Sequence, residues 1–283
     1  MLLFIQNAWL LSRMQLRSLV LSRRMLLCIV LAAAPVVIAW FAGAHEDAAE
    51  IVPLLGLFLI LQVVAPLISL TVGSSVVTEE IESRTITYIF TRPTDRAAFF
   101  VGRLAASTLV SSILLGISSM GVVLVATYPR QGMANLKRVH HRRGAHEMVE
   151  IVRDLPDGSI LGLLVAATVA AAMYTLISAG LGVFYKRAMI LALAYTFAIE
   201  GFLANIPGSS QKLSIQFYLR SLLTSSQEVR TGFLSDIPIL AKMLAKTTFY
   251  SAPQALGQLS LIYLVLLLVA SLGIRRRQYL MTS

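Results

Sequence analysis

The sequence predicts an all-α integral membrane protein with about six transmembrane helices. Three observations lead to this fold class: 57% of the 283 residues are apolar, only 13% are charged, and the apolar residues gather in long runs. Soluble domains carry charge on about a quarter of their residues, and a helix that crosses a bilayer needs ~20 mostly apolar residues in succession. We therefore expect a single transmembrane domain over residues 1–283.

The first element that we expect is an interfacial amphipathic helix over residues 1–24. Arg13, Arg17 and Arg24 recur at helical spacing between leucines, so that arginines can face lipid phosphates while leucines face the membrane. A signal peptide is the alternative, because Ala42-Gly43-Ala44 resembles a cleavage site. The apolar run 25–41 exceeds the ~7–15 residues of a signal-peptide core, which favours an uncleaved anchor.

Six apolar runs are long enough to predict transmembrane helices. They cover residues 25–41, 51–77, 97–128, 159–185, 188–204 and 259–274. Two weaker apolar stretches, 215–223 and 237–244, are too short to span the membrane. Because they fall within the segment 205–258, we expect short re-entrant or surface helices there, before the last span.

The distribution of basic residues predicts that both termini are cytoplasmic, in a cell inner membrane. Loops on the cytoplasmic side carry an excess of Lys and Arg, and this topology places the N-terminal arginines, Lys186-Arg187 and Arg275–Arg277 on that side. The basic loop 129–158 opposes the rule, because the same topology places it outside the cytoplasm.

Composition also excludes several classes of function. The net charge of +10 does not indicate nucleic acid, because basic residues of membrane proteins commonly set topology or contact lipid headgroups. The single cysteine, Cys28, rules out an intrachain disulfide and a cysteine-based metal site. The loop 129–158 contains His140, His141 and His146, but its many basic residues would repel a cation, so we expect no metal there. This loop could instead contact a periplasmic partner or membrane lipids.

The most specific segment is the predicted cytoplasmic loop 78–96, between the second and third spans. It begins with Glu79, Glu80 and Glu82, continues as a short amphipathic stretch and is interrupted by Pro93. A short charged helix held parallel to the membrane is suited to receive force from a soluble partner. An ordinary solvated loop is the alternative interpretation.

The stretch 80–103 resembles the signature of ABC-2 type transporter permeases. The matching residues are Glu80, Glu82, Thr85, Pro93, Arg96 and Gly102-Arg103, and the run Tyr88-Ile-Phe-Thr-Arg-Pro93 is especially close to the family pattern. Arg84 stands where many relatives have Gly, and Arg103 where Lys is commoner. The wider order of the elements, from the interfacial helix to the last span, also resembles that family.

The resemblance implies a permease subunit of an ABC transporter that pairs with a second permease copy, identical or not, and with two ATP-binding cassette subunits. The loop would then be the coupling helix, and its interface with the ATPase would comprise Glu79, Glu80, Glu82, Arg84, Thr85, Arg92, Pro93 and Arg96. A gate between the two copies would involve the second and fifth spans.

No catalytic residues are expected on this chain. It lacks a G-x-x-x-x-G-K-[ST] phosphate-binding loop, so that ATP and Mg²⁺ would belong to the partner ATPase. No nucleophile–base pair or paired-carboxylate site is visible either. The alternative function is a non-transporting membrane scaffold that anchors a soluble or periplasmic partner.

Glu200 is the one acidic residue within a predicted span. It lies about thirteen residues from the cytoplasmic end of that span, or ~20 Å at 1.5 Å per residue. An acid at this depth is costly and marks a candidate for the translocation path or gate. The alternative is that water reaches Glu200 near the outer headgroups. Elsewhere, the small residues Ser178, Gly180 and Gly182 and the pair Ser112 and Gly116 are expected to permit close helix contacts.

Overall fold

The computed structural model describes residues 2–42, 55–79, 96–127, 159–185, 187–205, 209–223 and 250–276. These residues form helices and contain no strand, which confirms the predicted all-α class. Several predicted features lie outside the described residues: most of the coupling loop (80–95), the basic loop with its histidines (128–158) and the stretch 237–244.

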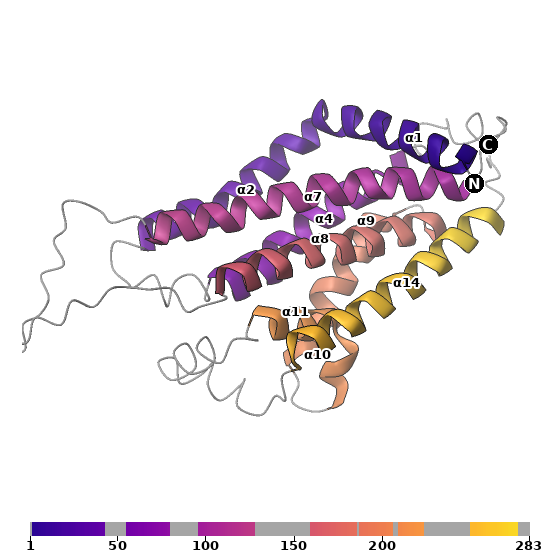
Figure 1. Cartoon of the computed structure of the whole chain (residues 1–283). Helices are drawn as coiled ribbons and strands as arrows, with labels where there is room; N and C mark the ends of the chain where they lie inside the picture. The colour runs from indigo at the N-terminus through magenta and orange to yellow at the C-terminus, as the bar shows by residue number, and fades with distance from the viewer. Residues whose placement is uncertain are drawn as a thin grey trace, which may run out of the picture.

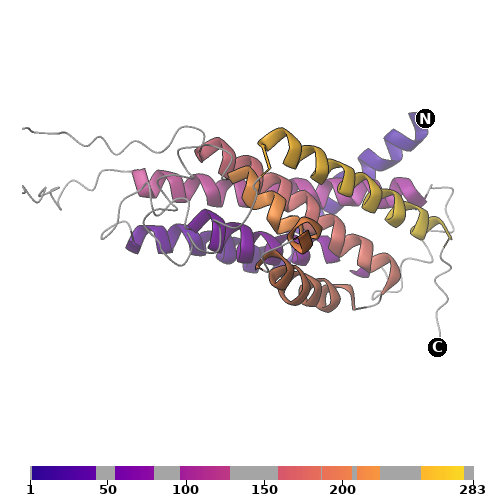
Figure 2. The ribbon, with the colours of Figure 1, turned by 90° about the horizontal axis from the view of Figure 1, so that it is seen from below.

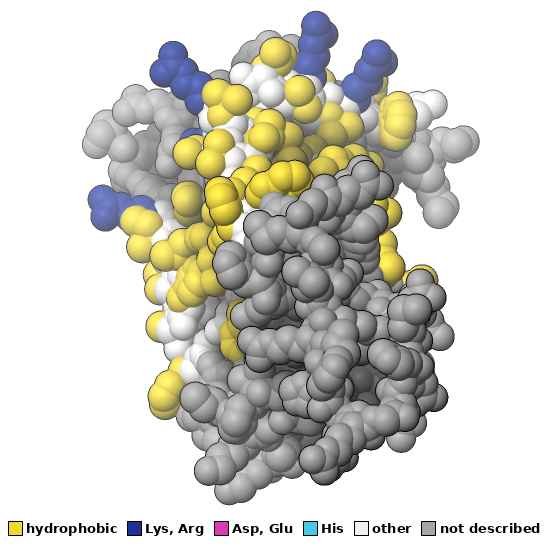
Figure 3. Space-filling model, turned by 90° about the vertical axis from the view of Figure 1, so that its left-hand side faces the viewer, with side chains coloured by type: hydrophobic (Ala, Val, Ile, Leu, Met, Phe, Trp, Pro, Cys, Tyr) yellow, Lys and Arg dark blue, Asp and Glu magenta, His cyan; other side chains and the backbone are white. Residues whose placement is uncertain are grey.

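Four helices are long and apolar enough to cross a membrane: α2 (Arg23–Ala42), α7 (Arg96–Thr127), α8 (Ser159–Phe184) and α14 (Ala252–Arg276). Much of their apolar surface faces outward rather than into the protein; only 17% of the apolar window of α14 is buried. On the face that Figure 3 shows, hydrophobic side chains cover much of the described surface in view, with Lys and Arg at its edge. Such extensive apolar surface indicates a membrane protein.

The four long helices run roughly along one axis, and the start of α1 (Leu2–Val20) lies at the same end of the bundle as the end of α14 (Figures 1 and 2). We call this the terminal end, and the opposite one the distal end. The helix α1 (Leu2–Val20) packs along the part of α7 nearest the terminal end. Arg13 and Arg17 of α1 are exposed and Leu19 is buried, as the amphipathic pattern predicts. The polar Gln15 is also buried and Val20 is exposed, which the pattern does not predict.

A shorter apolar rod, η1 (Leu55–Val64) followed by α4 (Ala65–Ser74), covers most of the second predicted span. Its wide π-helical turns end where Pro66, which lacks an N–H group, opens α4. The rod lies close to α8, because a β-carbon on Gly73 would come within 2.6 Å of the Thr175 carbonyl oxygen. The Ser178 hydroxyl donates to the Leu70 carbonyl at 2.9 Å, which confirms a close helix contact at Ser178.

The other small-residue positions divide into two groups. A β-carbon on Gly182 would lie 3.2 Å from the Thr78 hydroxyl, so this glycine also permits a close contact. Around Gly116, by contrast, there is nothing within 4 Å of such an atom. The Ser112–Gly116 spacing therefore does not mark a close helix contact at Gly116 in the described chain.

The fifth predicted span is a single rod of α9 (Ala188–Ala194), η2 (Tyr195–Glu200) and α10 (Gly201–Asn205). It runs steeply across the direction of α7, α8 and α14 (Figure 1). Length along this rod therefore does not equal distance along the long helices. The ~20 Å that helix rise gives for Glu200 is a length along the rod and not a depth.

A short helix, α11 (Ile215–Leu223), follows the 3₁₀ turn η3 (Ser209–Leu213) with the bounds that the sequence predicts. Every residue of α11 except Arg220 is buried. Its end packs on the distal half of α8, since a β-carbon on Gly162 would lie 3.3 Å from the Leu222 carbonyl oxygen. The helix is thus held within the bundle, and whether it is re-entrant or surface-lying stays a prediction.

The last helix, α14, begins seven residues before the predicted start at 259, so the predicted segment 205–258 was drawn too long. Ala252-Pro253 opens the helix, and proline suits a first helical turn because its missing N–H would have no helical partner there. The Gln254 side chain accepts a hydrogen bond from the Ser251 N–H at 3.3 Å. A search for uninterrupted apolar residues misses such a polar first turn.

Candidate functional site

The terminal end of the bundle holds both flanks of the predicted coupling segment. Of its eight predicted interface residues, only Glu79 and Arg96 lie within the described chain. Arg96 is the first residue of α7. The others lie outside the described residues: Glu80, Glu82, Arg84, Thr85, Arg92 and Pro93.

Glu79 forms an ion pair at the corner between α1 and α2. Its Oε1 accepts a hydrogen bond from Nη1 of Arg24 at 2.8 Å, and both side chains are partly exposed. Exposed pairs of this kind contribute about 0–1 kcal/mol to stability. The pair therefore orients the start of the coupling segment relative to α2 more than it stabilises the fold.

A buried polar chain joins three helices directly behind this ion pair. Gln15 of α1 donates through Nε2 to the Ser75 hydroxyl at 3.0 Å, and accepts at Oε1 from the Arg103 Nε at 2.5 Å. Gln15 and Arg103 are 2% and 6% exposed. Buried polar groups are costly when unpaired, so these bonds hold α1, the end of α4 and the start of α7 in one arrangement.

Gly102 explains why α1 can approach α7 so closely. A β-carbon at this position would come within 2.4 Å of the Ala8 carbonyl oxygen, and in contact with two further backbone atoms of that residue. Gly102 thus lets α1 and α7 pack closely, and Arg103 beside it forms a hydrogen bond across the same contact. Both residues match the family pattern at the start of the third span.

The segment before Glu79 also contacts the turn between α8 and α9. Gly182 lies two residues before the end of α8, and its added β-carbon would meet Val77, Thr78 and Ala188 within 3.7 Å. Val77 and Ala188 are fully buried. The flanks of residues 80–95 are therefore packed against α1, α2, α7 and the α8–α9 turn, so a displacement of one flank has to move several helices.

Glu200 forms a second, buried site. Its side chain is 1% exposed, and its Oε1 accepts a hydrogen bond from the Gln216 N–H at 2.8 Å. This N–H is one of the unpaired donors in the first turn of α11, where a negative charge is favoured by the helix dipole. Glu200 thus caps α11 and faces the protein interior, not the water of a headgroup region.

The residues around Glu200 place it near the middle of the bundle. Tyr174, midway along α8, is fully buried and lies near Glu200 and Gln216. Arg220, one turn further along α11, interacts with Glu200 and donates to the Gln62 side chain of η1 at 3.2 Å. An acidic and a basic side chain therefore belong to the same buried region, beside the middle of α8.

Three oxygens of this cluster have no hydrogen-bond partner within the described chain: Tyr174 Oη, Glu200 Oε2 and Gln216 Oε1. Of these residues, sequence analysis identified only Glu200. Gln62 within an apolar span and Arg220 within a short apolar stretch were the available signals, because polar side chains in such runs need partners. Gln15, on the apolar side of α1, was a similar signal at the first site.

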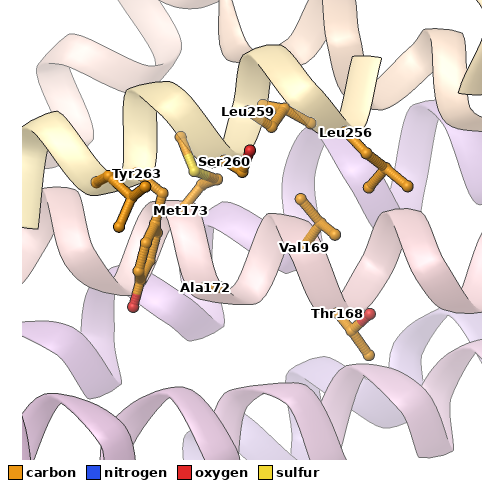
Figure 4. Close-up of a pocket in the computed structure, with 9 residues that line it drawn as sticks. Thr168, Val169, Ala172, Met173, Leu256, Leu259, Ser260 and Tyr263 are labelled. Carbon is orange, nitrogen blue, oxygen red and sulfur yellow. The ribbon is translucent and has the colours of Figure 1, made fainter. Parts of the chain in front are cut away.

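Two apolar grooves flank α14. The distal groove, of about 420 Å³, lies between α8 and α14 and is lined by Val169, Met173, Leu256 and Tyr263 among others (Figure 4). The terminal groove, of about 710 Å³, lies on another side of α14, between the terminal halves of α8 and α14 and the rod that starts with α9. Lys212 is the only charged residue that lines either groove.

Neither a scan against protein-family models nor a comparison with curated proteins gives a match for this chain. The fold and the two sites define an all-helical membrane protein. One site is a tightly packed junction at its terminal end, and the other is a buried charged cluster at mid-depth.

Proposed function

We propose that the chain is the permease subunit of an ABC transporter of the ABC-2 type. In this proposal it forms six transmembrane spans in the cell inner membrane, with the terminal end of the bundle in the cytoplasm. It lines half of a translocation pathway with a second permease copy, and residues 78–96 seat in a separate ATP-binding cassette subunit. ATP and Mg²⁺ bind to that subunit.

The observation that carries this proposal is the construction of the terminal end. Residues 80–103 have the sequence pattern of the family's coupling element, and the described flanks of residues 80–95 contact α1, α2, α7 and the turn between α8 and α9. A segment that transmits force needs flanks that cannot move independently of the spans. The contacts of Gly102, Arg103 and Glu79 meet this requirement, whereas a solvated loop has no need of them.

The mid-depth cluster supplies the second part of the proposal. Transporter binding sites and gates commonly lie near the bilayer midplane, beside helices that are interrupted there. The rod α9–η2–α10 ends in a turn, α11 starts at mid-depth, and Glu200 joins the two. In the proposed mechanism, movement of the α8–α9 turn on ATP-driven closure of the cassettes shifts this rod, and Glu200 keeps α11 coupled to it.

Co-purification with an ATP-binding cassette subunit tests the proposal. A cassette protein encoded beside this chain should purify with it in detergent. Glu80→Lys or Glu82→Lys should abolish that association or uncouple ATP hydrolysis from transport, with the helix content unchanged. Arg23→Glu, a charge reversal at an exposed residue of α2, is the matched control. A preparation without any ATPase favours the scaffold instead. Full association and transport in both glutamate variants would contradict the coupling role of residues 78–96.

A further inference from the structure

The terminal groove combines an apolar lining with a single cation. Leu, Ile, Val, Ala, Phe and Gly form nearly all of its lining, and the polar exceptions are Tyr185, Tyr195 and Lys212. Its volume of about 710 Å³ falls within the ~300–1,000 Å³ typical of small-molecule sites. Along α8 the groove runs from Leu176 to Tyr185, a length of ~14 Å at 1.5 Å per residue.

Lys212 lies at the inner end of this groove, far from either end of the bundle. Its carbonyl accepts a hydrogen bond from the Tyr218 hydroxyl at 2.8 Å, which ties it to α11. The first turn of α11 contacts Glu200 beside Tyr174, near the middle of α8. A lysine at that depth in a membrane is costly unless an anion or water neutralises its charge.

The described chain offers Lys212 no such anion. No aspartate or glutamate is among the described residues that line the groove. Glu200, the nearest acid in sequence, already caps α11 and interacts with Arg220. Lys212 is exposed and is one of the residues that line the groove.

We propose that the terminal groove binds a long-chain anionic amphiphile from the bilayer. Its apolar chain lies along α8 between Leu176 and Tyr185, and its carboxylate or phosphate head pairs with the Lys212 ammonium. The apolar lining selects the chain, and the compact charge of lysine selects an anionic head. Binding of the amphiphile does not depend on transport. Only the further step, that the amphiphile is the cargo, rests on the proposed function.

Gly180 offers a way to fill the groove without disturbing the fold. It lines the groove from α8, and a β-carbon there would only touch the Ala270 side chain at 3.6 Å, an ordinary contact. Gly180→Leu therefore occupies the space where the chain of the amphiphile lies. Gly257→Leu is its matched control, because a β-carbon on this α14 glycine meets nothing within 4 Å.

The test measures binding of radiolabelled hexadecanoate to the purified full-length protein in detergent, with uncharged hexadecanol as the second probe. Loss of a charge-assisted pair should weaken hexadecanoate binding to Lys212→Gln by roughly tenfold or more. Lys212→Arg should retain binding of the acid, and hexadecanol should bind equally to all three proteins. Gly180→Leu should weaken both probes, whereas Gly257→Leu should weaken neither.

Two results would overturn the inference: equal affinity of Lys212→Gln and the unaltered protein for hexadecanoate, or equal effects of the two glycine variants. The binding test and the co-purification test of the proposed function can fail independently of each other. Absence of a cassette partner would remove the transporter assignment and leave these affinities unchanged. Conversely, a cassette partner without selective hexadecanoate binding would remove only the groove assignment.

Discussion

Gly102 of α7 lies directly against the backbone of Ala8 in α1, so closely that a β-carbon on the glycine would be 2.4 Å from the Ala8 carbonyl oxygen. No side-chain rotation can relieve that contact, because the opposing atoms belong to the backbone. The position of the first helix on the bundle therefore depends on a glycine in a helix that begins almost ninety residues later.

Gly102→Ala should displace α1 and destabilise the protein by about 1–3 kcal/mol, the usual cost of forcing extra atoms into a packed contact. Thermal unfolding in detergent, followed by circular dichroism, measures this effect. Gly116→Ala in the same helix is the control, because space is open around Gly116 and alanine favours helix formation. Equal melting temperatures for the two variants would show that the close contact is absent.

The buried chain through Gln15 should appear as an energetic coupling between residues distant in sequence. Gln15→Leu removes the oxygen that accepts the Arg103 Nε–H, and we expect a loss of about 1–3 kcal/mol, as for a buried donor that loses its acceptor. A double-mutant cycle with Arg103→Met should show coupling, because the two substitutions disrupt one network. Pairing Gln15→Leu with Arg13→Met, at an exposed position, should give additive effects.

The ion pair between Arg24 and Glu79 should contribute little to stability. Because both groups are partly exposed, we expect Glu79→Gln to change the free energy of unfolding by about 1 kcal/mol or less, and high salt to reduce the difference. Denaturation at low and high ionic strength measures both effects. A loss well above that range, unaffected by salt, would indicate a buried pair.

Glu200 should act mainly through the hydrogen bond to α11. Glu200→Gln keeps a side-chain oxygen for the Gln216 N–H, and we expect it to fold with nearly unchanged stability. Glu200→Ala removes that acceptor and should cost about 0.5–2 kcal/mol, as for a lost helix cap. If both variants lose transport while only the alanine variant loses stability, the carboxylate has a role beyond capping. Equal melting temperatures for the two variants would contradict the capping role.

The predicted six-span topology places the basic loop 129–158 outside the cytoplasm. A cysteine in place of Lys137, in a Cys28→Ala background, should react with a membrane-impermeant maleimide added outside intact cells. Labelling of this cysteine only from the cytoplasm would contradict the six-span arrangement.

The helical class and the approximate extent of most helices could be predicted because a bilayer demands long apolar runs. The start of α14 could not, since its first turn uses Pro253 and Gln254 rather than apolar residues. The steep course of the rod from Ala188 to Asn205 was equally out of reach, because an apolar run fixes length and not direction.

The sites divide in the same way. Glu200 could be found by its charge within an apolar run, but its partners Tyr174, Gln216 and Arg220 come together only through tertiary packing. Gly102 and Arg103 were visible through a family pattern, and Gln15 through its polarity on the apolar side of α1. The backbone carbonyl of Ala8, which Gly102 approaches, carries no such local signal.

Site-specific cross-linking tests the central claim, that residues 78–96 seat in an ATP-binding cassette subunit. A photoreactive maleimide would be attached to a cysteine at Glu82→Cys in a Cys28→Ala background, with the cassette protein co-expressed. The proposal predicts a cross-linked product of the two chains from position 82 and none from a matched cysteine at Lys137→Cys. Absence of the product from position 82, or equal yields from both positions, would contradict it.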